Sequence, residues 1–458
     1  MIVKLLWGAR RIAPLIIIIL LFAVVGGSQA QVADETALTT ARQLLQLLVA
    51  EDYAGAEALF DAPMTAAMPR ETLQETWETG IIGQVGVYQE ELAATVEPYN
   101  EYKIVTLTAQ FEQLALDVQV TVNPDGTVGG LFFRPNFNPP GAETPTLPDY
   151  IDPTAFTETE INIGGDANEE LPGTLALPVG DGTFPAVVLV HGSGPNDRDE
   201  TIGPNKPFRD IAQGLASHGI AVLRYDKRTL IYPEQFIGAL FTVEEETIND
   251  AALAVALLRE MEMIDGEHIF VLGHSLGGLV APRIGAADPN IAGLIIAAGN
   301  TRPLEDLILE QTLYLANLDG QVTEEETIAL ADAQTIVTTV RALTTTDAAN
   351  TDLIFGAPPV YWLDLHDYDP IATAQAYPNP LLILQGERDY QVTLVDFAGW
   401  QTGLSERDDV TFITYPALNH LFMTGEGASS PTEYFTPGYV DAEVVMDIIE
   451  WVLANSGS

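Results

Sequence analysis

The spacing of apolar and polar residues changes once along the chain, at residues 136–153, which read NFNPPGAETPTLPDYIDP. A segment rich in proline and polar side chains is typical of a semi-rigid linker between folded parts. The pattern therefore predicts a smaller domain at residues 31–135 and a larger domain at residues 154–458.

Before this linker, apolar residues first follow helical spacing and then alternate with polar residues. Helices are expected at residues 38–48, 53–60 and 71–79, and strands at residues 88–96, 102–111, 114–122 and 128–133. The run Asn123-Pro124-Asp125-Gly126 is a turn signal before the last of these strands. Helices followed by antiparallel strands predict a small α+β domain.

After the linker, short apolar runs without alternation are separated by helical segments. These runs cover residues 186–190, 220–223, 269–272, 294–298, 381–384 and 410–415. Such runs suit strands that are buried on both faces of a parallel sheet. One helix is expected from Thr242, which can form a capping box with Glu245, to about Met263. Residues 301–376 are helical in pattern and fall between two strands, which predicts an inserted cap.

The sharpest motif of the chain is Gly273-His274-Ser275-Leu276-Gly277, which lies between an apolar run and a helical segment. This is the strand-turn-helix setting of the G-x-S-x-G nucleophile elbow. The flanking glycines leave room for a tight turn, so the Ser275 hydroxyl is exposed at the edge of the sheet. We therefore expect Ser275 to be a nucleophile. The alternative is a glycine-rich turn in an ordinary βα unit.

A serine nucleophile needs a base and an acid that orients the base. His420 follows the last predicted strand and Asp389 follows the strand before it, so the order along the chain is Ser275, Asp389, His420. We expect Asp389 to orient His420, with Glu387 and Asp396 as rival acids. Surface or capping roles are expected for three other histidines, His218, His268 and His366.

The negative charge of a tetrahedral intermediate needs N–H donors. One donor is expected to be the N–H of Leu276, at a helix N-terminus whose dipole favours negative charge. The second is expected to be the N–H of Ser193, in the loop that follows residues 186–190, with Gly192 as the fallback. Charged side chains near this loop are expected to brace it, and the alternative is that they bind substrate. They are Arg198, Asp199, Asp226, Lys227 and Arg228.

From about residue 154 onward, five segments together resemble the α/β-hydrolase superfamily, and within it bacterial serine esterases of the dienelactone-hydrolase-like and acyl-peptidase-like kinds. The segments are HGSGPNDRDE (191–200), LRYDKRT (223–229), GHSLGG (273–278), GERDYQV (386–392) and NHLF (419–422). The resemblance implies an eight-stranded, mostly parallel sheet with a helical cap. It also implies hydrolysis of a small-molecule carboxylic ester through an acyl-enzyme, without a metal or organic cofactor. The smaller domain resembles exported modules of unknown function that precede such esterases, with a cystatin-like fold.

Other functions stay open at this point. Peptidases, thioesterases and acyltransferases use the same fold, and fold analogy alone does not separate them from esterases. A cell-surface binding protein with an inactive hydrolase scaffold is a different class, and the complete set of serine, acid and histidine argues against it. Aromatic residues of the cap suit either an acyl pocket or, more often, the core: Tyr314, Phe355, Tyr361 and Trp362.

Composition limits the partners of the chain. Lys and Arg number 19 and Asp and Glu number 65, so the net charge is 19 − 65 = −46. Phosphate backbones repel such a chain, which argues against nucleic acid as a partner. The chain has no cysteine, so disulfides, thiolate catalysis, Cys-based zinc sites and a lipid-modified N-terminal cysteine are excluded. No feature predicts an oligomeric state.

The first 30 residues are typical of an export signal. Basic residues precede an uncharged stretch at residues 12–33, whose apolar centre is short for a membrane span. Ser28 and Ala30 place small side chains at the −3 and −1 positions of a cleavage site. We expect a cleaved signal peptide, with an uncleaved N-terminal anchor as the alternative and the only predicted membrane contact. In either case the body of the protein is exported.

Overall fold

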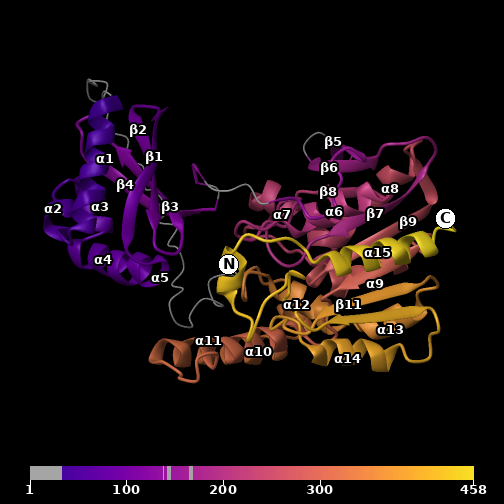
Figure 1. Cartoon of the computed structure of the whole chain (residues 1–458). Helices are drawn as coiled ribbons and strands as arrows, with labels where there is room; N and C mark the ends of the chain where they lie inside the picture. Colours follow the sequence, from indigo (N-terminus) through magenta and orange to yellow (C-terminus); the bar gives the residue numbers. More distant parts are fainter. Residues whose placement is uncertain (1–33, 138, 142–145, 165–168, 458) are drawn as a thin grey trace. The chain divides into compact units, whose positions relative to one another are not determined.

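The computed structural model describes residues 34–137, 139–141, 146–164 and 169–457 (Figure 1). Within these residues the chain forms two compact units that divide near residue 144. The predicted export signal lies outside the described residues. Among the residues that are described, no helix is both long enough and apolar enough to cross a membrane.

The N-terminal unit packs helices against a four-stranded antiparallel sheet in the order β1-β2-β3-β4. Its helices are α1 (Asp34–Val49), α2 (Tyr53–Glu57), α3 (Ala62–Ala67), α4 (Arg70–Glu75) and α5 (Gly83–Val85), and its strands are β1 (Tyr88–Tyr99), β2 (Tyr102–Phe111), β3 (Ala115–Val122) and β4 (Val128–Asn136). Leu44 and Leu48 of α1 are fully buried in one core with Val105 and Leu107 of β2. The α+β prediction is confirmed, and the cystatin-like likeness stays a prediction.

The larger unit is built on an eight-stranded sheet in the order β12-β11-β10-β9-β7-β8-β6-β5. Its strands are β5 (Phe156–Ile163), β6 (Leu171–Pro178), β7 (Phe184–Val190), β8 (Ala221–Tyr225), β9 (Ile264–His274), β10 (Gly293–Ala297), β11 (Leu381–Gly386) and β12 (Val410–Tyr415). The six strands from β12 to β8 are parallel to their neighbours, whereas β6 pairs antiparallel with β8 and with β5. This confirms the predicted α/β architecture.

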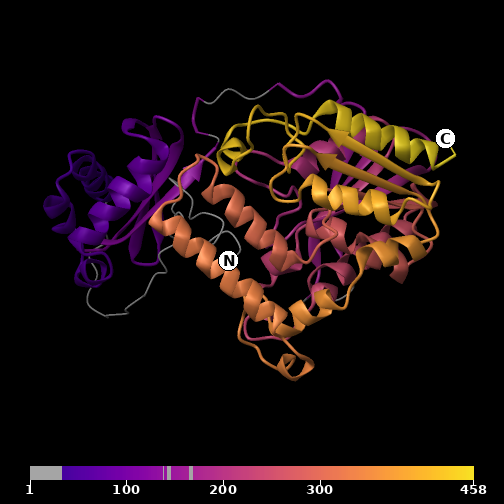
Figure 2. The same cartoon turned by 90° about the horizontal axis from the view of Figure 1, so that it is seen from below.

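Helices cover both faces of this sheet (Figures 1 and 2). Helices α8 (Asn249–Arg259), α9 (Leu276–Ala287) and α14 (Leu394–Gly403) pack on one face, and α6 (Pro207–Ser217) and α15 (Ala442–Ala454) pack on the other. The central strands are continuously apolar because both faces are covered. In β7, for example, Val188 and Val190 join one core and Val187 and Leu189 the other. Each such fully buried side chain contributes about 1.5–3 kcal/mol to the free energy of folding, relative to an exposed one.

Between β10 and β11 lie the helices of the cap. They are α10 (Leu304–Ala316), α11 (Glu324–Arg341), α12 (Pro359–His366) and α13 (Pro370–Ala376). Helix α11 begins at a capping box formed by Thr323 and Glu326. Helix α12 packs into the core, where Trp362 is 1% exposed and donates its Nε1–H to the carbonyl of Ile354. Tyr361 is also buried, so both aromatics are core residues.

Three local features differ from the sequence prediction. Apolar runs do not reveal the β5–β6 hairpin, because β5 reads FTETEINI and is mostly exposed. The helix expected to reach Met263 is a π-helical turn (Glu244–Ile248) followed by α8. It ends at Arg259 because the chain turns there to enter β9. In the N-terminal unit, α4 continues as a π-helical segment to Ile82, beyond the expected end.

Candidate active site

Four loops with chemically active residues meet at one edge of the eight-stranded sheet. They follow β7, β9, β11 and β12, whose parallel alignment brings their carboxyl ends together. The order of the strands reverses between β7 and β9, since β8 lies beyond β7 and β10 lies beyond β9. Ligands of open α/β sheets bind in the crevice at such a switch point. The loops after β7 and β9 flank that crevice.

Ser275 lies on the turn between β9 and α9 with φ 55° and ψ −117°. A residue other than glycine adopts this left-handed backbone only under constraint. The constraint comes from close packing, because a Cβ on Gly273 would lie 2.1 Å from the carbonyl oxygen of Gly277. Ser275 is partly exposed while His274 and Leu276 are buried. The turn thus presents the serine hydroxyl at the sheet edge, as a nucleophile elbow requires.

His420 and Asp389 are joined by a hydrogen bond of 2.6 Å between Nδ1 and Oδ2. Both side chains are buried, at 4% and 5% exposed. Asp389 Oδ1 accepts the backbone N–H groups of Gln391 and Val392, and Oδ2 accepts from Gln385 Nε2. These contacts hold the carboxylate in place, so the imidazole has Nδ1 engaged and Nε2 left for proton transfer.

The two rival acids are engaged elsewhere. Glu387 accepts a hydrogen bond from Thr414. Asp396, which is fully buried, pairs with the guanidinium of Arg302 at 2.6 Å. Asp389 is therefore the acid that the structure brings to His420.

The loop that carries His420 lies beside the elbow. His274 Nε2 donates to the backbone carbonyl of His420 at 2.9 Å, and the centres of the two rings are 4.7 Å apart. Asn419 fixes the loop from within, because its Oδ1 accepts the N–H groups of Leu421 and Met423. The hydrogen bond from His274, the residue before Ser275, therefore ties the elbow to the backbone of His420.

The two expected oxyanion donors lie on opposite sides of the switch point. Leu276 is the first residue of α9, so its N–H is not used by the helix. The N–H of Ser193 has no hydrogen-bond partner among the residues that the structure describes. The fallback donor is wrong, because the N–H of Gly192 donates to Glu200 Oε1 at 2.7 Å. Gly192 also packs on the elbow, where a Cβ would lie 3.1 Å from Ser275 Cβ.

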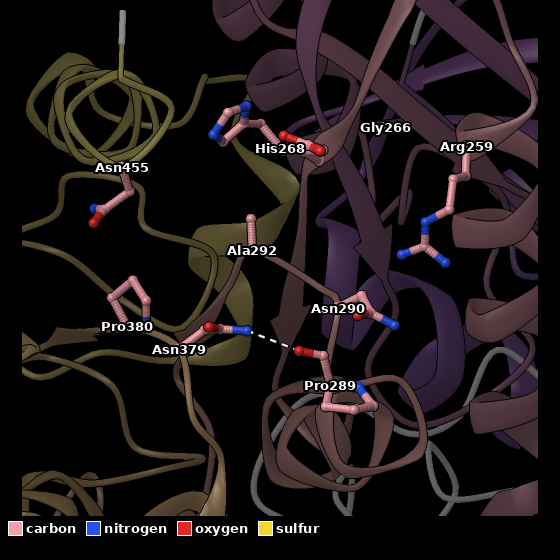
Figure 3. A pocket seen from close by; sticks show the side chains of 10 residues that line it. Arg259, Gly266, His268, Pro289, Asn290, Ala292, Asn379, Pro380 and Asn455 are labelled. Carbon is pink, nitrogen blue, oxygen red and sulfur yellow. Dashed lines mark hydrogen bonds between the residues drawn. The ribbon is translucent and has the colours of Figure 1, made fainter.

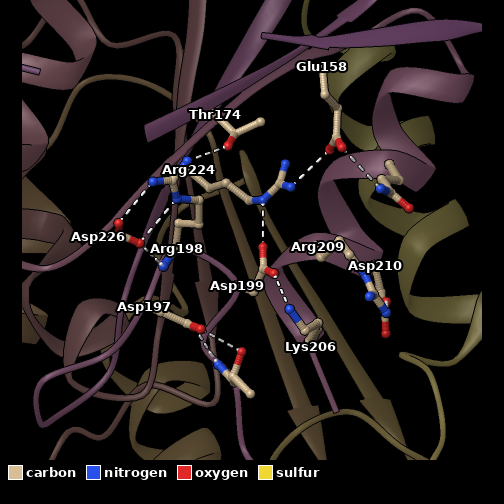
Figure 4. A network of polar contacts seen from close by, with 12 residues as sticks. Glu158, Thr174, Asp197, Arg198, Asp199, Lys206, Arg209, Asp210, Arg224 and Asp226 are labelled. Atoms are coloured by element: carbon tan, nitrogen blue, oxygen red, sulfur yellow. Dashed lines mark hydrogen bonds and ion pairs between the residues drawn. The ribbon is translucent and has the colours of Figure 1, made fainter. Parts of the chain in front are cut away.

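The charged side chains after β7 are paired with one another (Figure 4). Arg198 binds Asp226 at 2.9 Å, and Asp199 lies between Arg224, at 2.9 Å, and Lys206, at 2.8 Å. Two further pairs complete the set, Lys227 with Glu246 and Arg228 with Asp250. Because every predicted cation of this region has a carboxylate partner, the geometry favours bracing of the loop over binding of an anionic substrate.

Sequence patterns do not single out Glu200. This residue is 3% exposed, has φ 51°, and forms an ion pair with His274, with Oε2 and Nδ1 2.8 Å apart. Burial lowers the pKa of His274, yet the facing Glu200 carboxylate outweighs it and leaves that pKa above its usual value. Burial raises the pKa of Glu200, but the charged His274 outweighs burial and leaves that pKa below its usual value. The motif HGSGPNDRDE contains Glu200, but nothing in the sequence marks it as buried.

The other histidines lie outside this arrangement. Burial lowers the pKa of His191 to about 4, and its Nε2 bonds the carbonyl of Asp197. The three histidines expected in surface or capping roles make local contacts: His218 with Gly214, His268 with Asp265 and His366 with Glu305. In the described part of the chain, no group of three or more His, Asp or Glu side chains converges as a metal site would require.

A pocket of about 660 Å³ lies at the opposite edge of the sheet (Figure 3). His268, Ala292 and Pro380 line it from the amino-terminal ends of β9, β10 and β11. Two of its polar residues are engaged, as Arg259 pairs with Asp288 at 2.8 Å and Asn379 donates to the carbonyl of Pro289. The candidate active site therefore rests on the loops at the carboxyl edge and not on this cavity.

Known proteins match both units of the chain. A model of the alpha/beta hydrolase family matches residues 187–435, and a model of a family of unknown function, DUF3887, matches residues 41–131. Esterase EstD of Thermotoga maritima is 38% identical over 412 residues, which cover 89% of this chain and 93% of that protein.

Two solved structures are similar to the chain at low identity. Est1E from Butyrivibrio proteoclasticus is 16% identical with a TM-score of 0.42, over 65% of this chain and 99% of that one. An esterase from Pyrococcus furiosus is 17% identical with a TM-score of 0.39, over 58% of this chain and 84% of that one. On the strength of the family model and of the relative from Thermotoga, the chain belongs to the alpha/beta hydrolase family.

Proposed function

We propose that the chain is a serine esterase in which Ser275 is the nucleophile, His420 the general base and Asp389 the acid that orients it. The observation that carries the proposal is the 2.6 Å hydrogen bond between His420 and Asp389, on a loop whose backbone is bonded by His274, the residue before Ser275 on its left-handed turn. The 38% sequence identity to a protein named an esterase, over nearly the whole of both chains, supports an ester as the substrate.

In the first half of the reaction, Ser275 Oγ attacks the ester carbonyl carbon while His420 Nε2 takes the hydroxyl proton. The carbonyl oxygen becomes an oxyanion, and the N–H groups of Leu276 and Ser193 donate to it. The dipole of α9 adds to this stabilisation because its N-terminus starts at Leu276. Collapse of the intermediate breaks the C–O bond, and the leaving alkoxide receives the proton from His420.

In the second half, water attacks the acyl group on Ser275 and His420 again takes the proton. The tetrahedral intermediate collapses, the carboxylic acid leaves, and the proton returns to Ser275 Oγ. Asp389 stays ionised throughout, since its role is to hold the imidazole and to stabilise the imidazolium that forms twice. Burial of the pair strengthens this interaction, because the interior screens charge less than water does.

Hydrolysis of p-nitrophenyl acetate tests the proposal. The purified chain is expected to release p-nitrophenol, and Ser275→Ala is expected to lose at least about a thousandfold in kcat. Ser193→Ala is the matched control, because it removes the other serine hydroxyl of the site and keeps its backbone N–H. Equal rates for Ser275→Ala and the unaltered chain would overturn the proposal.

An acyltransferase would give a different product. With an alcohol added to the reaction, an esterase forms mainly the free acid, and an acyltransferase forms mainly the new ester. We expect the free acid to dominate at every alcohol concentration at which the enzyme stays folded. Gas chromatography of both products decides the matter. A dominant new ester would replace the hydrolase assignment by the transferase one.

The chain is also proposed to be exported. The uncharged stretch at residues 12–33, after basic residues, supports this. Expression of the full chain in a bacterial host, followed by fractionation and N-terminal sequencing, tests it. Extracytoplasmic protein that starts at Gln31 indicates cleavage, and membrane-bound protein with the original N-terminus indicates an anchor. Cytoplasmic protein with an intact N-terminus contradicts export.

A further inference from the structure

The backbone N–H and the backbone carbonyl of Gly192 are both held by buried charged side chains. Its N–H donates to Glu200 Oε1 at 2.7 Å, and its carbonyl accepts from Lys227 Nζ at 2.9 Å. Both side chains are nearly inaccessible, at 3% and 1% exposed. The N–H belongs to the peptide group before Gly192, and the carbonyl belongs to the peptide group that also carries the Ser193 N–H. These two charge-assisted hydrogen bonds therefore limit the rotation of both peptide groups. The next residue along the chain is Ser193, the donor assigned to the oxyanion.

The carboxylate side of this clamp leads to the catalytic histidine. Glu200 uses Oε1 for Gly192 and Oε2 for the ion pair with His274 Nδ1. His274 Nε2 bonds the carbonyl oxygen of His420. Because a carbonyl can only accept, Nε2 must carry a proton. One carboxylate therefore connects the oxyanion loop, the residue before the nucleophile and the loop of the base.

The ammonium side leads to the cap. Lys227 Nζ, besides the carbonyl of Gly192, binds Glu246 Oε1 at 2.8 Å, and Glu246 Oε2 accepts the hydroxyl of Tyr361 at 2.7 Å. Tyr361 lies in α12 of the cap, whereas Lys227 follows β8. Three consecutive buried polar contacts thus join the cap to the carbonyl group of Gly192.

We propose that Glu200 and Lys227 are positioning residues, which clamp the peptide groups on the two sides of Gly192 so that the Ser193 N–H points at the oxyanion. Tyr361 of the cap supports the Lys227 side. The proposal rests on the proposed function, because it assigns Ser193 an oxyanion. Neither clamp residue touches the substrate. They are expected to stabilise the transition state, in which the oxyanion carries the most negative charge, and to leave substrate binding unchanged.

Two variants of Glu200 separate position from charge. In Glu200→Gln the amide oxygen can still accept from Gly192, and the amide nitrogen can donate to a neutral His274, so the clamp is kept without its charge. In Glu200→Asp the charge is kept, but the shorter side chain cannot reach both partners. We expect Glu200→Gln to keep most of kcat and Glu200→Asp to lose about tenfold to a hundredfold, part of the effect of removing one oxyanion donor. KM should change little in either variant.

A trifluoromethyl ketone supplies a readout that loss of stability does not move. Its adduct with Ser275 carries an oxyanion, so its affinity follows transition-state stabilisation. In Glu200→Asp, affinity for the ketone should fall by the same factor as kcat/KM. In Tyr361→Phe, both should fall together by a smaller factor. Asp288→Ala is the control. Asp288 accepts the N–H of Asn290 and pairs with Arg259 at the far edge of the sheet, so its loss should lower the melting temperature only.

Three outcomes would overturn the proposal. A Glu200→Asp enzyme with wild-type kcat and ketone affinity would show that the clamp is not needed. A Glu200→Gln enzyme as impaired as Glu200→Asp would show that hydrogen bonds to Gly192 and His274 do not hold the loop without the carboxylate charge. An unchanged Tyr361→Phe enzyme would show that the cap does not support the clamp. If the unaltered chain fails to hydrolyse p-nitrophenyl acetate or to form the ketone adduct, the proposed function itself fails.

Discussion

Replacing Asp389 by asparagine is expected to move the imidazole proton of His420, the proposed general base, from Nδ1 to Nε2, because of how the site distributes donors. Oδ1 accepts two backbone N–H groups, those of Gln391 at 2.7 Å and Val392 at 3.0 Å. Oδ2 accepts from Gln385 and from His420. An amide oxygen can occupy only one of these two positions, and the amide nitrogen must occupy the other.

The backbone decides between the two orientations. An amide oxygen at the Oδ1 position keeps both hydrogen bonds from the backbone. It loses only the side-chain hydrogen bond from Gln385. The reverse orientation leaves two backbone N–H groups facing an N–H₂ group, and each buried unpaired donor costs about 1–3 kcal/mol. The first orientation is thus the stable one. It turns a donor towards His420 Nδ1, so the imidazole keeps its proton on Nε2 and cannot take one from Ser275.

The expected loss in kcat for Asp389→Asn is about a thousandfold to ten-thousandfold, as for other triads with the wrong tautomer. That corresponds to about 4–5.5 kcal/mol of transition-state stabilisation. Folding should weaken by only about 1–3 kcal/mol, from the lost Gln385 bond. Steady-state rates on p-nitrophenyl acetate and urea unfolding give the two numbers. Glu387→Gln and Asp396→Asn are the controls, and either one losing more activity than Asp389→Asn would refute the assignment of the acid.

Three further predictions concern the surroundings of the site. Burial lowers the pKa of His274, but Glu200 holds it above 6.5, so its stabilising effect is complete below pH 6.5 and is lost as pH rises through the folded-state pKa. Burial raises the pKa of Glu200, but His274 holds it below 4.5, so its effect is complete above pH 4.5 and is lost as pH falls through the folded-state pKa. The melting temperature of the unaltered chain should therefore exceed that of Glu200→Gln most between pH 4.5 and 6.5; a constant gap from pH 4 to 9 would contradict the ion pair. Gly277→Ala places a Cβ 2.2 Å from the carbonyl oxygen of Val190, and urea unfolding should report a loss of about 3 kcal/mol. Gly266→Ala, whose Cβ would meet nothing closer than 3.4 Å, is its control, and similar losses would contradict the packing argument. A half-ester of a dicarboxylic acid should have a higher KM than its neutral diester, since the chain carries a charge of −46 and the cations near the candidate active site are paired. Added salt should narrow this difference in KM. Equal KM values would point to an unpaired cation in the substrate-binding site.

Local patterns predict much of this architecture because parallel strands and strand-end loops leave strong marks. Continuous apolar runs identify the six strands from β12 to β8, and Gly273 and Gly277 mark the turn at Ser275. Asp389 and His420 could be selected by their places after the last two strands. The structure then pairs them by a hydrogen bond and pairs the rival Asp396 with Arg302. Long-range pairing decides between such rivals, and sequence spacing carries no information on it.

The features beyond the reach of sequence depend on burial that no local pattern encodes. Glu200 is one of 65 acidic residues, and only the folding of its loop onto β9 buries it against His274. The same fold removes Gly192 as an oxyanion donor, since its N–H is used by that carboxylate. The β5–β6 hairpin escapes for the opposite reason, because exposure of β5 erases the apolar run that marks the other strands.

The proposed mechanism requires a covalent acyl intermediate on Ser275. The most direct measurement quenches the enzyme with acid during turnover of p-nitrophenyl acetate and maps acetylated peptides by mass spectrometry. We expect one acetyl group, on the peptide that contains Ser275, and none in Ser275→Ala. Acetylation confined to another residue, in an enzyme whose Ser275→Ala variant still hydrolyses the ester at the wild-type rate, would contradict it.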